Sequence, residues 1–223
     1  LLPDSLGKLV RFLKVPLVVI INHGHHINSP FWNLKDRGID VESTMKCVLT
    51  TDQINAMSDD EINKVIENEF QYDDYQWQWD KKVEVNYKKR AEGLHKVLYQ
   101  CPSCLTEYKM TSQNDKLVCT HCQKSWTLSV LGRLSGDDGI TEFEHIPDWY
   151  EWERGNVKKE VDDGSYSFCS EAIVKSLPNA KGYVDLGKAS LTHDMNGFMV
   201  HGEYLGEKYT IEKPVASMYS CHI

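Results

Sequence analysis

The 223-residue sequence predicts an α/β segment followed by a small cysteine-rich ribbon and a small antiparallel β module. Three observations support this prediction. An amphipathic stretch and a short apolar run open the chain, in the pattern of a helix and a strand. Two Cys-x2-Cys pairs stand near its middle, and β-rich segments separated by turn residues follow Gly164. We therefore expect three domains, over residues 1–98, 99–132 and 145–223.

The first predicted elements are a helix and a buried strand. Residues 4–14 place apolar side chains on one stripe, and Val15-Pro16 ends the helix. The apolar run from Leu17 to Ile21 is typical of a strand covered on both faces, as in a parallel sheet. We expect the helix to pack its stripe on that sheet, with anionic lipid as the alternative partner of its basic side chains. Those basic residues are Lys8, Arg11 and Lys14.

A strand and two helices are predicted before the cysteines. Val41 to Leu49 alternates between the two faces of a strand. Ser58 and Glu61 have the spacing of a capping box, in which each side chain satisfies a backbone N–H at the start of a helix. The apolar residues of that helix are Ile62, Val65, Ile66 and Phe70. A further helix is predicted over residues 87–98, leading into the first cysteine pair.

The four paired cysteines predict a metal site. Each Cys-x2-Cys pair makes a tight turn that aims two thiolates at one point, and two facing pairs give a tetrahedral site that suits Zn²⁺. Tyr108 and Trp126 follow the two pairs at similar distances, as in the hairpins of a zinc ribbon. Four thiolates leave no position for water, so we expect a structural metal. The ligands are Cys101, Cys104, Cys119 and Cys122.

The last third of the chain combines a helix with short strands. Pro147 suits the first turn of a helix, which we expect to continue through Lys159. Turn residues such as Asn196-Gly197 separate the β-rich segments that follow. These predicted strands cover residues 166–168, 183–186, 198–200 and 204–211. Short consecutive strands joined by such turns predict an antiparallel sheet.

Composition restricts the partners and the compartment. The formal net charge of −8 argues against a dedicated nucleic-acid binder, which normally presents a basic surface. No apolar run reaches the ~18 residues that span a membrane. Of the seven cysteines, Cys47, Cys169 and Cys221 remain outside the metal site and suggest no disulfide framework. We therefore expect a reducing, cytoplasmic setting.

At this point the residues resemble a family. Pro3-Asp-Ser-Leu-Gly-Lys-Leu-Val10 and Lys14-Val-Pro-Leu-Val-Val-Ile20 resemble the last conserved block of the lysophosphatidate (1-acylglycerol-3-phosphate) acyltransferase superfamily, a helix followed by a valine-proline-valine strand. The stretch from His23 to Asn33, the cysteine ribbon, and Ile146 to Arg154 look like a bacterial branch of that superfamily. In that branch, an acyltransferase domain carries a C-terminal zinc ribbon and a β-rich tail.

The resemblance implies a reaction in phospholipid biosynthesis. The parent enzyme would transfer an acyl group from a thioester, on CoA or acyl carrier protein, to a lysophospholipid hydroxyl. Its His-x4-Asp dyad and its acidic-Gly-Thr-Arg phosphate clamp would lie upstream of Leu1, so this chain alone should be inactive. The first domain would then be the C-terminal part of an α/β acyltransferase domain. The resemblance also implies a cytoplasmic protein that can contact the inner membrane face peripherally.

Within this chain, His23 is the weak catalytic candidate. Asn22-His23 precedes Asn28 at the spacing at which the family places Asp after its histidine. A neutral amide can orient an imidazole but does not stabilise the imidazolium that proton transfer forms. The alternatives are a polar loop at the end of a strand and a second metal site made by His23, His25 and His26, which would suit a metal-dependent hydrolase. A zinc-ribbon interaction module without catalytic activity is the alternative function for the whole chain.

Overall fold

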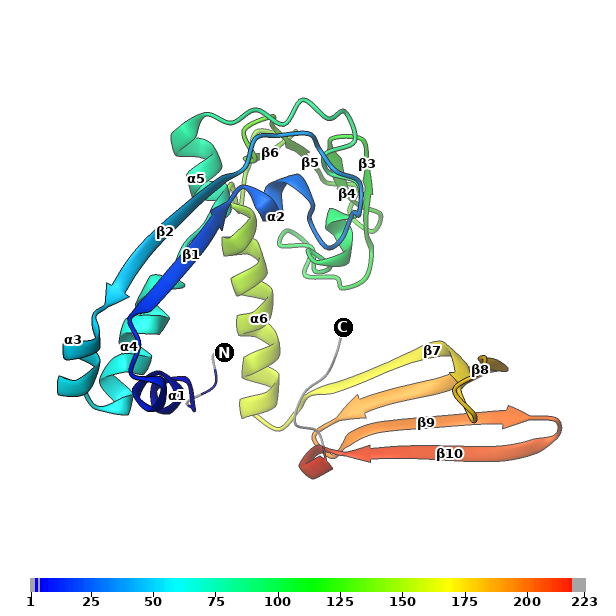
Figure 1. The fold of residues 1–223 in the computed structure, drawn as a ribbon. Helices are drawn as coiled ribbons and strands as arrows, with labels where there is room; N and C mark the ends of the chain where they lie inside the picture. The colour runs from blue at the N-terminus through cyan, green and yellow to red at the C-terminus, as the bar shows by residue number, and fades with distance from the viewer. Residues whose placement is uncertain (1–2, 4, 218–223) are drawn as a thin grey trace. The chain divides into compact units, whose positions relative to one another are not determined.

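The computed structural model describes residue 3 and residues 5–217, and the chain divides into two compact units, Leu1–Glu151 and Trp152–Ile223. Cys221 lies outside the described residues. Figure 1 shows the order of the elements. The helices are α1 (Ser5–Leu13), α2 (His25–Asn28), α3 (Thr51–Ala56), α4 (Asp59–Glu69), α5 (Asp74–Lys81) and α6 (Ile146–Asp162), with the 3₁₀ helices η1 (Leu94–Lys96) and η2 (Val215–Ser217). Within the described part, none of the helices combines the length and the apolar content needed to cross a bilayer.

Strands β1 (Leu17–His23) and β2 (Glu42–Leu49) pair as a two-stranded antiparallel sheet. The expectation of a parallel sheet with a strand buried on both faces is therefore wrong. Val19 is 6% exposed, whereas its neighbours Val18 and Ile20 are 48% and 57% exposed. An apolar run of this length fits a half-covered antiparallel strand as well as a buried parallel one, so the pattern alone could not decide between them.

One face of this sheet lies against helices. Lys46 is opposite Val19 in the ladder, and its ammonium pairs with the Glu69 carboxylate of α4 at 2.6 Å. At the end of β1, the His23 ring stacks on Trp77 of α5, with centroids 5.9 Å apart. In Figure 1, α4 and α5 lie along the ribbon that β1 and β2 form. The opposite face carries the exposed side chains of β1 and β2.

Helix α1 packs on a small apolar core rather than on the face of the sheet. The buried members of this core are Leu49, Ile54, Ile62 and Ile66. Leu6 and Val10 of α1 pack against them. Gly7 allows the close approach of α1 to α4, because a Cβ there would lie 2.2 Å from the Asp59 carbonyl oxygen. The Gly7 N–H donates to the Asn63 side chain at 2.7 Å. The predicted apolar stripe of α1 is thus confirmed, but it packs mainly against helices.

The capping box predicted at the start of α4 is confirmed. The Ser58 hydroxyl accepts a hydrogen bond from the Glu61 N–H at 3.3 Å, and the Glu61 carboxylate accepts one from the Ser58 N–H at 2.8 Å. Thr50 and Gln53 make an equivalent capping box at α3, which the sequence analysis missed. The consecutive helices α3 and α4 are therefore both capped by side chains at their N-termini.

We expect Ser58→Ala to lower the free energy of unfolding by about 1 kcal/mol, because the first turn of α4 loses its side-chain acceptor. Hydrogen bonds from Ser58 also hold the pKa of Glu61 below its ordinary value. The stability that this lowered pKa contributes is present above the ordinary pKa of a glutamate. It is lost as the pH falls through the lowered pKa. Urea denaturation at about pH 7 and about pH 3 should show a smaller difference between wild type and variant in acid. Ser170→Ala, at an exposed position of β7 (Ser167–Ser176), is the control.

Residues 87–98 do not form the predicted helix, and only η1 within this segment is helical. Gly93, just before η1, has a positive φ of 89°. The Ala91 N–H donates to the Asn114 carbonyl at 2.9 Å instead of to a carbonyl in its own segment. The Gly93 N–H likewise donates to the Ser112 hydroxyl at 2.9 Å. These two tertiary hydrogen bonds and the positive φ of Gly93 interrupt a helix that the modest helix propensity of the segment does not sustain.

The strands of the central module form one antiparallel sheet in chain order, β3 (Met110–Gln113), β4 (Lys116–Cys119), β5 (Ser125–Leu128) and β6 (Leu134–Gly136). We call residues 99–145 the four-cysteine module. Leu117, Trp126 and Leu134 are at most 1% exposed and form its core. The Trp126 indole N–H donates to the Glu142 carboxylate at 3.0 Å, and its ring packs edge-on against Trp149. The module therefore holds an apolar centre built around one tryptophan.

The second unit contains the predicted antiparallel sheet, which is confirmed. Its strand order is β10-β9-β8-β7, with β8 (Val184–Asp194), β9 (Gly197–Tyr204) and β10 (Glu207–Pro214). The predicted strand over 204–211 is interrupted, because Leu205 and Gly206 form the turn between β9 and β10 with positive φ angles of 52° and 84°. Apolar residues of neighbouring strands share one face of this sheet. They include Ala189, Leu191, Phe198, Val200 and Ile211.

Candidate functional site

The four paired cysteines converge in the structure, as predicted, and are close enough to bind a metal ion. Their sulfur atoms all lie within 4.8 Å of one another. The Cys101 and Cys122 sulfurs are 3.7 Å apart, and so are those of Cys104 and Cys119. Thiolates bound about 2.3 Å from a tetrahedral ion stand about 3.8 Å apart. These two separations therefore match edges of such a tetrahedron. No other group of this kind occurs among the residues that the structure describes.

Both Cys-x2-Cys turns use the same backbone pattern. In the first turn, the Cys101 N–H donates to the Thr106 carbonyl at 3.0 Å, and the Leu105 N–H donates to the Cys101 carbonyl at 2.8 Å. In the second turn, the corresponding bonds from Cys119 and Gln123 measure 2.9 Å each. The residue after each pair is left-handed, with φ of 61° at Leu105 and 64° at Gln123. Two equivalent turns thus present their sulfurs to a common point.

The surroundings of the cluster favour thiolate at one of its members. Burial acts to raise the pKa of the Cys104 thiol, but hydrogen bonds from the Thr106 hydroxyl and backbone outweigh it and hold this pKa below its ordinary value. The Thr106 hydroxyl also contacts the His121 ring at 3.4 Å. Thiolate is the form that binds metals. Cys101 and Cys119 are fully buried, so a bound ion would be shielded from water on one side.

We expect Leu105→Gly to stabilise the module by about 1 kcal/mol, because glycine adopts a left-handed backbone without the cost that a side chain pays there. Leu105 is 62% exposed, so little packing is lost. The thermal midpoint of the metal-loaded chain measures the effect. Leu34→Gly is the matched control, since Leu34 is 90% exposed but does not have a positive φ. A midpoint that falls equally in both variants would contradict the backbone explanation.

The structure places His23 and Asn28 in different hydrogen-bonding environments. The His23 ring lies between Trp77 and Tyr72, and its Nδ1 is buried without a hydrogen-bond partner in the described residues. The Asn28 side chain accepts from the Ile39 N–H at 3.2 Å and donates to the neighbouring Ser29 hydroxyl. Asn28 therefore orders its own loop, and no contact between it and His23 is found. His25 is exposed, and the three histidines do not form a metal-binding group.

A buried carboxylate that the sequence analysis missed holds this histidine-rich loop. Asp74 is 6% exposed and accepts hydrogen bonds from the Gly24 N–H at 2.9 Å and the His26 N–H at 3.2 Å. Gly24 has a positive φ of 79°, and a Cβ there would lie 2.8 Å from the Trp77 ring. The sequence signal for a buried carboxylate here was Asp73-Asp74 between Tyr72 and Tyr75. The loop after β1 is thus fixed to the first turn of α5.

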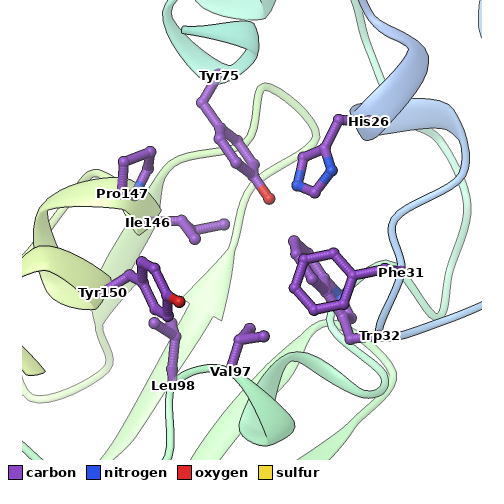
Figure 2. A pocket seen from close by; sticks show the side chains of 9 residues that line it. All are labelled: His26, Phe31, Trp32, Tyr75, Val97, Leu98, Ile146, Pro147 and Tyr150. Carbon is purple, nitrogen blue, oxygen red and sulfur yellow. The ribbon is translucent and has the colours of Figure 1, made fainter. Parts of the chain in front are cut away.

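Next to this loop, an apolar pocket of about 210 Å³ opens in the first unit. Figure 2 shows its lining side chains, with the His26 ring and the Tyr75 hydroxyl pointing toward the cavity from one end. The complete lining is His26, Phe31, Trp32, Tyr75, Val97, Leu98, Ile146, Pro147 and Tyr150. Burial lowers the pKa of His26, against the opposing effect of Asp74, and so favours its neutral form. Aromatic residues from sequence segments near positions 75 and 150 thus meet in one cavity.

Comparisons of this chain with protein-family models, with curated proteins and with solved structures find no match.

Proposed function

We propose that this chain is the C-terminal part of a glycerolipid-type acyltransferase. The parent enzyme transfers an acyl group from a thioester of CoA or acyl carrier protein to the hydroxyl of a lysophospholipid. The proposal rests on the resemblance of residues 3–20 to the last conserved block of that superfamily, together with one structural observation. It places the parent in the cytoplasm, with peripheral contact to the inner membrane face.

The observation that supports the proposal is the open face of the β1–β2 sheet. Val18 and Cys47 are directly paired, as are Ile20 and Met45, so all four side chains share this face. Ile20 is 57% exposed and Met45 is 74% exposed. A two-stranded sheet is marginally stable by itself, and apolar sheet faces are normally covered by a second layer. Further strands and helices of an α/β domain would supply that cover.

Helix α1 and the residues after it carry further exposed apolar side chains. Phe12 is 82% exposed, and Leu13 and Val15 are 53% exposed each. These residues flank Lys14-Val15-Pro16, the segment that carries the resemblance. In the family this segment shapes the acceptor or acyl pocket, which would bury such side chains. The exposed surface is therefore what we expect of a domain that continues in polypeptide outside this chain.

His23, the catalytic candidate within this chain, is not placed to act as the base of an acyl transfer. Attack of a hydroxyl on a thioester needs a general base in contact with the proton that it removes. His23 lies between the Tyr72 and Trp77 rings, and its buried Nδ1 has no hydrogen-bond partner among the described residues. We propose that the base is the histidine of an upstream His-x4-Asp motif. We also propose that the four cysteines hold Zn²⁺ in a zinc ribbon, where the metal cross-links two turns and supplies no chemistry.

The test is an acyl-transfer assay with lysophosphatidate and acyl-CoA. The protein encoded by the whole reading frame should turn over substrate, and changing its upstream histidine to Ala should abolish turnover. His23→Ala in that protein is the control and should keep activity. The present chain alone should be inactive. Turnover by this chain alone that disappears in His23→Ala would overturn the proposal and make Asn22-His23 the site.

A second candidate function is an interaction module without catalysis. It is favoured by the β7–β10 sheet, whose apolar face leaves Ile211 49% exposed. Liposome pelleting and gel-shift assays with a salt titration distinguish lipid and nucleic-acid versions of this candidate. Binding that persists in a protein with no acyl-transfer activity would favour it over the enzyme. The acidic net charge argues against the nucleic-acid version.

A further inference from the structure

The apolar pocket near His26 differs from ordinary packing defects in its size and its polar end. Its volume of about 210 Å³ exceeds the ~150 Å³ of an engineered apolar cavity that binds benzene. Phe31 is 66% exposed and Tyr150 is 43% exposed, so the pocket can be reached from solvent. Figure 2 shows Val97 and Leu98 at the end away from the Tyr75 hydroxyl. The cavity therefore has apolar walls and hydrogen-bonding groups at one end.

The aromatic walls hold one another in place. The His26 ring meets Trp32 edge-on at 5.1 Å and Tyr75 edge-on at 6.0 Å, and Phe31 meets Trp32 edge-on at 5.1 Å. Such pairs restrict ring rotation and add to the stability of the wall. Trp32 is also fixed through its backbone, because its carbonyl oxygen lies against Gly93. The pocket is thus formed before any ligand arrives.

The charges around the pocket select against ionic ligands. A neighbouring hollow shares His26, Tyr75 and Pro147 with the pocket and is also lined by Asp73 and Asp74. An anionic group would be repelled there. A cationic group would find both carboxylates already in use, Asp74 by two backbone N–H groups and Asp73 by the start of α5 and by His145. An uncharged group meets neither cost.

We propose that this pocket binds the end of an uncharged alkyl chain, the tail of an acyl group. That the bound alkyl chain belongs to an acyl substrate rests on the proposed function. That the pocket binds an alkyl chain rests on the pocket itself. Scaling from the cavity that holds the six carbons of benzene, the pocket takes roughly eight carbons. In a short 1-alcohol used as a probe, the hydroxyl would meet the Tyr75 hydroxyl and the His26 ring at one end of the pocket.

Titration calorimetry with a series of 1-alcohols from butanol to decanol tests the site. Each added methylene should tighten binding by about fourfold, because about 0.8 kcal/mol is gained per buried CH₂. The gain should stop at roughly eight carbons, and octanoate should bind more weakly than octanol. Affinity that does not depend on chain length would overturn the proposal, and so would equal affinity for octanol and octanoate.

Val97→Trp fills the pocket and should weaken octanol binding at least tenfold. Ile173→Trp is the matched control, since Ile173 is 68% exposed on β7 and lies outside the lining. If Val97→Trp fails to fold, magnetisation transfer from octanol to the wild-type chain decides: contacts to the methyls of Val97, Leu98 and Ile146 support the site, and contacts only elsewhere overturn it.

The two proposals fail separately. Octanol binding in the pocket, combined with no acyl transfer by the full-length protein, would remove the acyltransferase and leave an alkyl site. Acyl transfer without octanol binding to the pocket would refute only the proposed alkyl site.

Discussion

Replacing Cys119 with Ser should unfold the four-cysteine module and release its metal ion. Cys119 is fully buried at the end of β4, and its sulfur is one of the four that converge. Structural zinc sites contribute about 10–16 kcal/mol of apparent binding free energy to small domains, which is as large as the whole stability of a typical domain. A three-ligand site cannot replace that contribution. Chelation of the wild-type chain should have the same effect, because metal binding and folding are coupled in modules of this size.

Metal analysis, thermal denaturation and limited proteolysis measure this prediction. The wild-type chain should carry about one Zn²⁺, and the variant should carry none and be cut within residues 99–145. Cys169→Ser is the control, because Cys169 is an exposed free thiol on β7. An unchanged melting profile after metal removal would refute the structural role. A second zinc per chain would direct attention to His23, His25 and His26 instead.

The features that the sequence predicted correctly are those set by short-range signals. The spacing of the four cysteines predicted the cluster, because each Cys-x2-Cys turn aims two sulfurs at one point. The four are Cys101, Cys104, Cys119 and Cys122. The capping box at Ser58 needs only four consecutive residues to form. The hairpin turn at Asn196-Gly197 fixes the pairing of β8 with β9 in the same local way. In the capping box and the hairpin, neighbours in sequence are also partners in space, and each Cys-x2-Cys turn is local in the same way.

The features that the sequence analysis predicted wrongly depend on distant partners. Leu17 to Ile21 has the composition of a strand buried on both faces, but only the helices that lie against one face decide which side chains are covered. Residues 87–98 have moderate helix propensity, but the Ala91 N–H bonds to the distant Asn114 carbonyl and the Gly93 N–H to the Ser112 hydroxyl. The apolar pocket is lined by residues from four separate segments, so no local sequence pattern could have predicted it.

Replacing Gly93 with Ala should destabilise the first unit by about 2–5 kcal/mol. Gly93 has a φ of 89°, which costs an alanine about 1–2 kcal/mol. Its Cβ would also lie 2.3 Å from the Trp32 carbonyl oxygen, and relieving such a contact with backbone costs about 1–3 kcal/mol more. The Trp32 segment is the part that must move, and its indole is a wall of the pocket. Urea denaturation measures the loss of stability, and octanol titration should show a weaker site in the same variant.

Gly139→Ala separates the two contributions. Gly139 has a nearly identical φ of 86°, but nothing lies within 4 Å of its would-be Cβ. This variant should therefore lose only about 1–2 kcal/mol, the backbone part, and should bind octanol as the wild type does. The difference between the two variants reports the contact between Gly93 and Trp32 alone. If both lose the same free energy, the close approach of these segments is not tight, and the wall of the pocket must be held chiefly by the aromatic contacts of His26 and Phe31.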